Sequence, residues 1–547
     1  MSGSSYKNLM IRASTFKSIF NKGLALSLAK WLLLSLVFSL AYTQSHLYND
    51  NQNTKFLHGL AMGGMGLLKQ DWLANTADPL PVFSLMVSFT YAFLSERLFY
   101  VYFALLMGVY AYSMLGIASA LYGMERSLAN YLAYFAVILA VHSIWGEILV
   151  RKTLGFDLSL LNFGLAGQYL LGLDFQNSSF GVFLLLSIHA FLQRKYVWAI
   201  LWLTLASIFH SAYLFSAGLL TAAYLGSLFF ENLKKQAGGM TPIRRMGGAA
   251  KQPFLLGLLA LALVAPVVLY NQVVTSSTSP GLSEQALSIL VNQRIPHHTL
   301  PRVWMDSGAY IQIAIMIAGM LVVSKTRLFP AMLVPFLGGA AGMLVQIITG
   351  SNSLALLGPW RVSVFLLPLS TCLLIAWPVA KFFDRFQQQV GRLLPVIIVL
   401  SLAAVVFLAR YGYEIQRGRF ARYEKQAVHA VMNFVKQTKA PEQVYLIPPR
   451  DNQFDEFRTY TGAPAFINWK SHPYRDFEVM EWYQRNLLAK DFYNLEPTAA
   501  CQTLQKIVGE YGVTHVVVDL EKRDIACAGL QETYRDQRYA VYALQRP

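Results

Sequence analysis

The stretch LLPVIIVLSLAAVVFLAR at residues 393–410, followed by YGYEIQRGRFARYEKQ at 411–426, marks a change in the character of the chain. Before it, long apolar runs alternate with short polar breaks, and after it the composition is that of a soluble domain. A run of roughly 18 or more apolar residues predicts a membrane-spanning helix, because lipid offers no hydrogen-bond partners to an open backbone. The sequence therefore predicts a membrane domain at residues 1–409 and a C-terminal domain at residues 410–547.

The composition is typical of a polytopic membrane protein and gives no support to nucleic-acid binding. Hydrophobic residues make up 55% of the 547 residues, and the mean hydropathy of +0.41 exceeds that of ordinary soluble chains. The net charge is +16, but residues 410–547 hold 19 Lys and Arg against 17 Asp and Glu, so the excess lies in the membrane domain. Such an excess reports orientation in the membrane, whereas nucleic-acid binding would need a basic patch on the folded domain.

The apolar runs predict about thirteen transmembrane helices. Their expected ranges are 25–44, 80–95, 98–122, 130–148, 155–172, 180–193, 196–210, 213–230, 253–273, 308–324, 329–350, 359–379 and 393–409. If the N-terminus is cytoplasmic, most basic residues fall in cytoplasmic loops, Arg151 and Lys152 among them, as the positive-inside rule requires. An odd number of spans then places the C-terminal domain outside the cytoplasm.

The C-terminal residues predict a small α/β domain. Strands are expected at 443–447, 514–519 and 539–545, and helices at 476–489 and 500–511. In an oxidising compartment Cys501 and Cys527 either form a disulfide or remain two thiols, because spacing alone does not fix their geometry. The polar and aromatic stretch from Phe457 to Tyr474 either extends an active site from above or packs against a partner.

Asp50 is the candidate catalytic residue, in a first outer loop that begins YNDNQN at 48–53. It follows the first predicted span closely and so lies at the mouth of any cavity between the helices. A carboxylate there can accept a proton from a hydroxyl group or bind a divalent metal ion. The plainer alternative is a solvated acid that ends a helix. Glu125, in the next predicted outer turn, is either a second acid of the site or a local partner of Arg126.

The outer loop NQRIPHHTLPRVW at 292–304 supplies candidate substrate-binding residues. Arg294 can bind phosphate bidentately, and His297 and His298 can donate hydrogen bonds to it. The alternative is an anchor at the membrane interface, and two adjacent histidines without a third ligand are a weak metal signature.

Two further candidates lie at the predicted outer ends of spans. Arg361, in GPWRVS at 358–363, is an intramembrane charge that indicates either an anionic ligand or a side chain extended to the interface. His210, in FHSAY at 209–213, either lines the same cavity or is an ordinary buried histidine.

These features together resemble the GT-C superfamily of polytopic glycosyltransferases. The shared outline is a cytoplasmic N-terminus, a similar number of spans, an acidic residue early in a long first outer loop, and an external C-terminal α/β domain. The stretch FRTYTGAPAFINWK at 457–470, with EWYQR at 481–485, looks like the tail domain of an uncharacterised bacterial group within that set. The resemblance implies a sugar donor linked to polyprenyl phosphate or pyrophosphate, and Asp50 matches the first-loop acid.

The sequence therefore predicts an inner-membrane glycosyltransferase for surface glycan or glycolipid, with the C-terminal domain in the periplasm. Asp50 is the expected base or metal ligand, so a divalent metal ion is one option for a cofactor. The expected substrate-binding residues are Arg294, His297, His298, Arg361, His210 and Glu125. The lipid bilayer and a polyprenyl-linked sugar are the expected partners.

Two alternatives remain open from the sequence. One is a polysaccharide polymerase or ligase. The other is a non-enzymatic transporter or assembly factor that works with envelope-assembly proteins, although the lack of an internal repeat disfavours a transporter.

Overall fold

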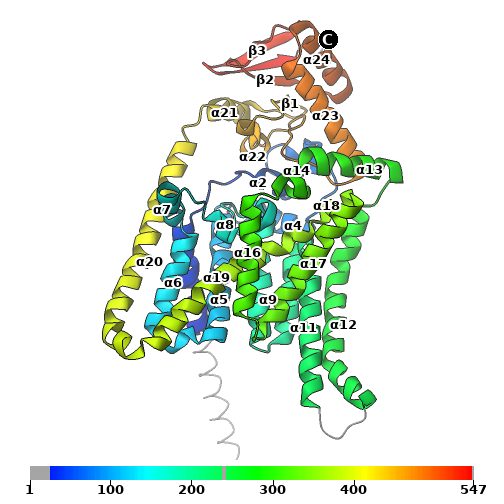
Figure 1. Ribbon diagram of the computed structural model, residues 1–547. Helices are drawn as coiled ribbons and strands as arrows, with labels where there is room; N and C mark the ends of the chain where they lie inside the picture. The colour runs from blue at the N-terminus through cyan, green and yellow to red at the C-terminus, as the bar shows by residue number, and fades with distance from the viewer. Residues whose placement is uncertain (1–24, 237–241, 545–547) are drawn as a thin grey trace, which may run out of the picture.

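The computed structural model describes residues 25–236 and 242–544, which form a helical bundle with a small α/β domain at one end (Figure 1). In these residues, seven helices are long and apolar enough to cross a membrane. They are the N-terminal helix (Ala25–Tyr42), α5 (Leu98–Tyr122), α11 (Leu214–Lys235), α12 (Pro242–Val274), α17 (Leu328–Thr349), α19 (Ser363–Arg385) and α20 (Gln387–Tyr423). The chain is therefore a polytopic α-helical membrane protein with a C-terminal α/β domain.

The remaining helices of the bundle are shorter. The helices α6 (Leu128–His142) and α7 (Ile144–Leu154) make an eighth candidate span, bent by 67° at Ser143, which has an extended backbone and caps α7. Shorter apolar helices are α4 (Pro81–Phe93), α9 (Val182–Leu192), α10 (Tyr196–Phe209) and α16 (Ser307–Val322). Connecting helices are α2 (Gln52–Lys55), α3 (Leu57–Met62), α8 (Ser159–Asn162), α13 (Pro280–Ile289), α14 (Pro296–Thr299), α15 (Pro301–Trp304) and α18 (Asn352–Leu357).

The range 80–95, predicted as a span, does not cross the bundle. At 13 residues α4 is about 20 Å long, which is less than the roughly 30 Å of a hydrocarbon core. Both of its ends lie near the terminal domain. Before α4, the Asp78 carbonyl accepts a hydrogen bond from Tyr270 (2.7 Å), near the end of α12; after α4, Glu96 accepts one from Tyr48 of the first loop.

The range 155–172, also predicted as a span, is an irregular segment around α8. Asp157 accepts a hydrogen bond from the Ser159 backbone (2.8 Å), and Ala166 has a positive φ of 58°. Irregular backbone is tolerated within a membrane protein where other protein groups satisfy its hydrogen bonds. Here the Gln312 side chain donates a hydrogen bond to the Phe163 carbonyl (2.8 Å). The preceding helix α7 stays near the end of the bundle that carries the terminal domain (Figure 1). Arg151 therefore lies at that end, which corrects the predicted loop assignment.

The structure also places Glu125 away from Asp50. Its carboxylate contacts the ammonium of Lys30 (2.9 Å), near the start of the N-terminal helix, whereas Gln44 and Asp50 follow the end of that helix. The 12 residues from Lys30 to Tyr42 span roughly 18 Å along the helix axis. Glu125 is thus at the opposite end of the bundle from Asp50, and its prediction as a substrate-binding residue is wrong.

The terminal domain is a four-stranded sheet with helices on both faces. The strand order is β1 (Tyr445–Leu446), β2 (His515–Asp519), β4 (Tyr539–Leu544), β3 (Leu530–Arg535), with β1 parallel to β2 and the other pairs antiparallel. Val516 and Val518 of β2 pack with α23 (Asp476–Asn494) and α24 (Pro497–Tyr511), whereas Val517 packs with α21 (Val428–Thr438) and α22 (Phe457–Thr461). Alternate side chains of a strand face opposite sides of the sheet. Because helices cover both sides of β2, all three of these positions are apolar.

Two boundaries in this region are decided by the structure. The helix α20 continues without a break to Tyr423, so the predicted domain boundary at Arg410 falls inside it. Cys501 and Cys527 are joined in a disulfide with Cα atoms 5.4 Å apart, which settles a pairing that the sequence left open.

The terminal domain is fixed to the bundle through a buried ion pair between Asp71 of the first loop and Arg458 of α22. The Arg458 Nε lies 2.6 Å from the Asp71 carboxylate, and the two side chains are 3% and 0% exposed. Arg458 also donates to Asn468 and to the Ala465 carbonyl (both 2.8 Å), so its donors are satisfied.

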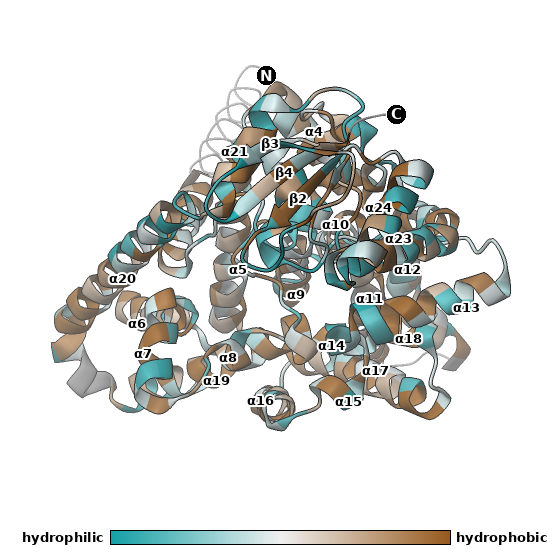
Figure 2. Cartoon of the chain, turned by 90° about the horizontal axis from the view of Figure 1, so that it is seen from above, coloured by the Kyte–Doolittle hydropathy of each residue, from teal (hydrophilic) through white to brown (hydrophobic). Residues whose placement is uncertain are grey.

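Seen from above, the terminal domain leaves α6, α7 and α16 uncovered (Figure 2).

The backbones also meet closely beside this ion pair. Leu67 donates a backbone hydrogen bond to the Gly462 carbonyl (2.7 Å), and a Cβ atom on Gly66 would lie 2.5 Å from that oxygen. Only glycine allows this approach, so the contact depends on Gly66 as well as on the charges.

The revised topology can be tested by cysteine labelling in a Cys372→Ser background. We expect Glu125→Cys to react from the same membrane side as Lys235→Cys, and Arg151→Cys to react from the opposite side. A membrane-impermeant maleimide applied to intact and to opened bacterial cells distinguishes the two sides. Labelling of Glu125→Cys together with Arg151→Cys would contradict the arrangement described above.

Removal of one partner of the buried ion pair should release the terminal domain. Arg458→Ala leaves the Asp71 carboxylate buried and unpaired, which typically costs about 3–5 kcal/mol. The expected result is a lower unfolding temperature in detergent and faster proteolysis between α20 and α21. Arg535→Ala, which removes an exposed pair with Glu532, is the control and should change neither. Equal behaviour of the two variants would show that the ion pair does not hold the domain.

Candidate functional site

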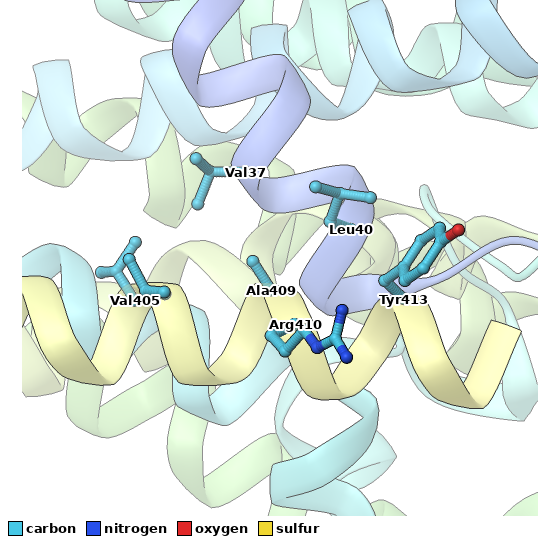
Figure 3. A pocket seen from close by; sticks show the side chains of 7 residues that line it. Val37, Leu40, Val405, Ala409, Arg410 and Tyr413 are labelled. Carbon is cyan, nitrogen blue, oxygen red and sulfur yellow. The ribbon is translucent and has the colours of Figure 1, made fainter.

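A shallow groove of about 440 Å³ between the N-terminal helix and α20 faces outward and is not the site (Figure 3). Its lining residues are Val37, Leu40, Val405, Val406, Ala409, Arg410 and Tyr413. The one charged group, Arg410, is paired along its own helix with Glu414 (3.0 Å). An exposed apolar groove of this kind is what lipid chains cover.

A cavity of about 860 Å³, here called the charged cavity, lies between the bundle and the terminal domain. Its walls come from the first loop, the segment 167–169, the start of η5 (Asn177–Gly181), the α10–α11 and α12–α13 junctions, and the segments 294–299, 353–361 and 470–476. Six of the seven predicted site residues line it: Asp50, His210, Arg294, His297, His298 and Arg361. The structure thus brings together side chains that are widely separated in the sequence.

Asp50 lies at this cavity in a strained turn. Tyr48 and Asp50 have φ angles of 67° and 42°, in a left-handed region that non-glycine residues rarely adopt. Asn49 holds the turn by donating to the buried carboxylate of Asp174 (3.1 Å), and Asn51 donates to the Tyr169 hydroxyl (3.2 Å). Such strain persists only where the surroundings impose it, and it is concentrated at functional positions.

Lys470 of the terminal domain contacts the Asp50 carboxylate with its ammonium group. The two side chains are 26% and 42% exposed, so the pair lies in the cavity rather than in the protein core. Burial raises the pKa of nearby Asp455 to about 6, even though Lys470 and Arg294 act to lower it. The terminal domain therefore supplies both a cation and a second acid close to Asp50.

Two guanidinium groups in the cavity lack acidic partners. Arg361, in η8 (Pro359–Val362), has an Nε without a hydrogen-bond partner, and its side chain forms no ion pair with the described residues. Arg294 ends a π-helical turn (Leu290–Arg294) and donates to the Lys470 carbonyl (2.5 Å), which leaves its Nε without a partner. Charged groups in such surroundings are costly unless an anion binds, so both point to an anionic ligand.

The side chains that line the cavity carry a net positive formal charge. Its lining holds four cations and two carboxylates: Lys55, Arg294, Arg361, Lys470, Asp50 and Asp476. The effect is visible at Tyr474, whose hydroxyl accepts a hydrogen bond from Lys55 (3.1 Å). Burial raises the pKa of Tyr474, but Lys55, Arg361 and Arg294 more than offset this, so its pKa lies below the ordinary value of 10.

The histidines of the cavity are neutral hydrogen-bonding groups rather than further charges. Burial, assisted by His297 and the nearby arginines, lowers the pKa of His298 to about 4. Burial is also the main cause that lowers the pKa of His210, His297 and His472. The Nδ1 of His298 lies 2.7 Å from the Ala166 carbonyl; with the proton on Nδ1, Nε2 is left to accept from a ligand.

Sequence reasoning missed Lys55, Asp174, Lys470 and Tyr474. For Lys470 and Tyr474 a signal existed, because both lie in the polar aromatic stretch that was considered as an extension of the site. No sequence signal pointed to Asp174, since it follows a segment that was wrongly predicted as a span. Lys55 is one charge in a long loop, and nothing local distinguishes it.

The charged cavity does not provide a metal site from its side chains. Among the described residues, no group of three His, Cys, Asp or Glu side chains is placed to hold a metal ion. The carboxylate of Asp50, which was the expected base or metal ligand, contacts the ammonium of Lys470. The divalent metal ion considered from the sequence stays a prediction.

A known family model matches one part of the chain. A family model described as a domain of unknown function (DUF6798) matches residues 426–489, which include Arg458, Lys470 and Tyr474. No curated protein matches the sequence. Among solved structures, that of ArnT from Cupriavidus metallidurans in the apo state aligns with 97% of this chain and 98% of its own, at 14% identity and a TM-score of 0.39. A similarity this low decides nothing about the site.

Asp174→Asn should stabilise the protein at neutral and alkaline pH. Burial, with a contribution from the charge of Asp50, raises the pKa of Asp174 from 3.8 to about 7. The folded protein then binds a proton between about pH 4 and 7 that the unfolded chain releases, so stability falls as pH rises through this window. A shift of about three units corresponds to at most about 4 kcal/mol above pH 7.

Thermal unfolding at pH 5 and pH 8 measures this effect. The variant should gain more over the wild type at pH 8 than at pH 5, because asparagine keeps the acceptor for Asn49 without the buried charge. An equal gain at both pH values would show that the carboxyl does not titrate in this window.

Proposed function

We propose that this protein is a bacterial inner-membrane glycosyltransferase that takes a sugar from a polyprenyl-phosphate carrier for surface glycan or glycolipid synthesis. The observation that carries the proposal is the unpaired guanidinium of Arg361 inside the charged cavity. Arginine binds phosphate bidentately, and Arg294 and Lys55 add positive charge on the same cavity. A phosphate supplies negative charge to a lining that holds four cations and only two carboxylates.

The rest of the cavity fits a lipid carrier better than a free sugar phosphate. Its apolar lining residues include Leu214, Ala286, Leu287, Leu290, Ile295, Leu356 and Leu357. The helices beside it expose further apolar side chains, such as Leu269 of α12 and Ile348 of α17. An isoprenoid chain can lie along this surface while its phosphate remains at the arginines, since burial of each CH₂ contributes about 0.8 kcal/mol.

In the proposed reaction Asp50 acts as the general base. The oxygen of an acceptor hydroxyl attacks the anomeric carbon of the donor sugar, and its proton passes to the Asp50 carboxylate. The bond between that carbon and the phosphate oxygen breaks, and its electron pair leaves with the polyprenyl phosphate. Arg361 and Arg294 stabilise the charge that develops on the phosphate. Lys470 positions the carboxylate, so this geometry requires the docked terminal domain.

We further propose that the N-terminus is cytoplasmic and that the charged cavity faces the periplasm. The end of the bundle away from the terminal domain carries clustered basic residues in its helix connections, including Lys234, Lys235, Lys325 and Lys381. Basic loops stay on the cytoplasmic side. An oxidising periplasm also suits the disulfide between Cys501 and Cys527.

The rival functions differ in what they require of Asp50. A polysaccharide polymerase or ligase would use the same cations and a base, and would differ in its acceptor. A transporter or assembly factor transfers no sugar and needs no base. The proposal is therefore tested first at Asp50.

Asp50→Asn keeps the size of the side chain and removes its basicity. Loss of a general base typically lowers the rate by about 10²–10⁴, so the sugar-transfer product should nearly vanish from cells or membranes that carry the variant. Glu125→Gln is the matched control, because it changes a carboxylate at the opposite end of the bundle. Full activity of Asp50→Asn would leave transport or assembly as the better function.

Arg361→Ala should weaken binding of the carrier without unfolding the protein. A charge-assisted contact contributes about 1.5–3 kcal/mol, equivalent to a loss of affinity of roughly 10-fold to 150-fold. The measurement is the thermal stabilisation of purified protein by undecaprenyl phosphate, with Lys234→Ala as the control. Unchanged stabilisation of Arg361→Ala would separate this arginine from phosphate binding.

A further inference from the structure

A second cavity, here called the aromatic cavity, lies on the other side of the first loop from the charged cavity. Its volume is about 440 Å³, and it is bounded by the first loop, the start of α5, the end of α20 and the terminal domain. Seven of its lining residues carry rings: His46, Tyr48, Tyr91, Tyr100, Phe420, Tyr423 and Tyr460. The lining thus differs in chemistry from that of the charged cavity.

The polar groups among these rings suit hydroxyl-rich ligands. Glu96 and Glu424 supply carboxylates, Lys436 and Lys439 supply ammonium groups, and Thr459 and Thr461 also contribute to the lining. Glu424 is exposed and forms no ion pair within the described part of the chain. Sugar rings present C–H groups to the negative faces of aromatic rings and hydroxyls to carboxylates, so rings and carboxylates together favour a saccharide.

The aromatic side chains are not a membrane-interface belt. Such belts point outward to the lipid headgroups, whereas these rings surround a space between two domains. The Tyr100 hydroxyl accepts a hydrogen bond from the Leu47 backbone (2.9 Å), and Tyr423 donates to the buried carboxylate of Glu456 (2.8 Å). His46 is stacked on Tyr423 with ring centroids 3.3 Å apart. The rings are therefore held in place around the cavity by protein contacts.

The first-loop turn separates the two cavities. Tyr48 lines the aromatic cavity and Asp50 lines the charged cavity, although only Asn49 lies between them. Tyr48 and Asp50 both have positive φ angles, so the backbone between the two linings is an irregular turn. Asp50 is thus two residues away from the lining of the aromatic cavity, and this turn is where two substrates would have to come together for a transfer reaction.

We propose that the aromatic cavity binds a saccharide unit of the acceptor and presents its hydroxyl toward Asp50. The role as acceptor site rests on the proposed function, whereas saccharide binding itself does not. The donor phosphate and the acceptor sugar then occupy different cavities, and the strained turn holds the base between them. Glycan and glycolipid acceptors share this saccharide chemistry.

Saturation-transfer NMR on the full-length protein in detergent tests the binding. The probes are four trisaccharides: maltotriose, cellotriose, mannotriose and chitotriose in its N-acetylated form. At least one should receive saturation from the wild type, and Tyr91→Ala and Tyr460→Ala should reduce that signal at least fivefold. Glu424→Ala, which alters only an exposed side chain, should reduce it as well and covers the case in which a tyrosine variant misfolds.

The controls distinguish this proposal from the proposed function. Tyr310→Ala removes an exposed tyrosine of α16 outside both cavities and should leave the signal unchanged. Asp50→Asn and Arg361→Ala should also leave it unchanged, even if they abolish transfer. No signal from any probe, or a signal that the aromatic-cavity variants leave intact, would overturn the proposal. Loss of the signal in Arg361→Ala would place the sugar in the charged cavity instead.

Discussion

The buried ion pair between Asp71 and Arg458 is the contact on which the candidate site depends. A buried pair of this kind is favourable only when all of its hydrogen-bonding groups are satisfied. Here the Asp71 carboxylate also accepts from the backbone of Leu73 (2.9 Å) and Ala465 (2.9 Å). The pair joins the first loop to the terminal domain, so it sets where Lys470 and the residues after it lie. A change in docking would therefore alter the surroundings of Asp50 directly.

The charged cavity combines unpaired charge with backbone strain, two features that folded proteins usually avoid. Cations are normally paired when they leave water, yet Arg361 has no acidic partner among the described residues, and the lining holds more cations than carboxylates. The turn that carries Asp50 adds backbone strain to this unbalanced charge. Both features oppose folding unless the surroundings or a ligand offset them, and such sites are where function is usually located.

The division of the space above the bundle into two cavities gives a physical basis for a two-substrate reaction. One cavity combines cations with an apolar wall, and the other combines aromatic rings with carboxylates. The first suits a lipid phosphate and the second suits a sugar. The backbone of the first loop forms the partition, because the short polar turn at residues 48–50 is pinned by Asp174 and Tyr169 on its flanks.

Much of the architecture followed from the sequence because burial in lipid imposes strong local constraints. Long apolar runs specified most of the spanning helices, and strand periodicity specified the terminal sheet. The residue types that bind phosphate also predicted Arg294, His298 and Arg361 as site residues without any tertiary information, and the structure brings these three to one cavity. The local pattern could not show that residues 80–95 stay at one end of the bundle. A short apolar helix has the same sequence pattern whether it crosses the membrane or not.

What the sequence determined by itself was therefore the membrane class, the terminal domain and the chemistry of most cavity residues. Only the tertiary structure decided that Glu125 lies away from Asp50, that Lys470 contacts Asp50, and that a second cavity exists. The reason is physical: hydropathy and periodicity act over neighbouring residues, whereas these features depend on contacts between segments that are hundreds of residues apart.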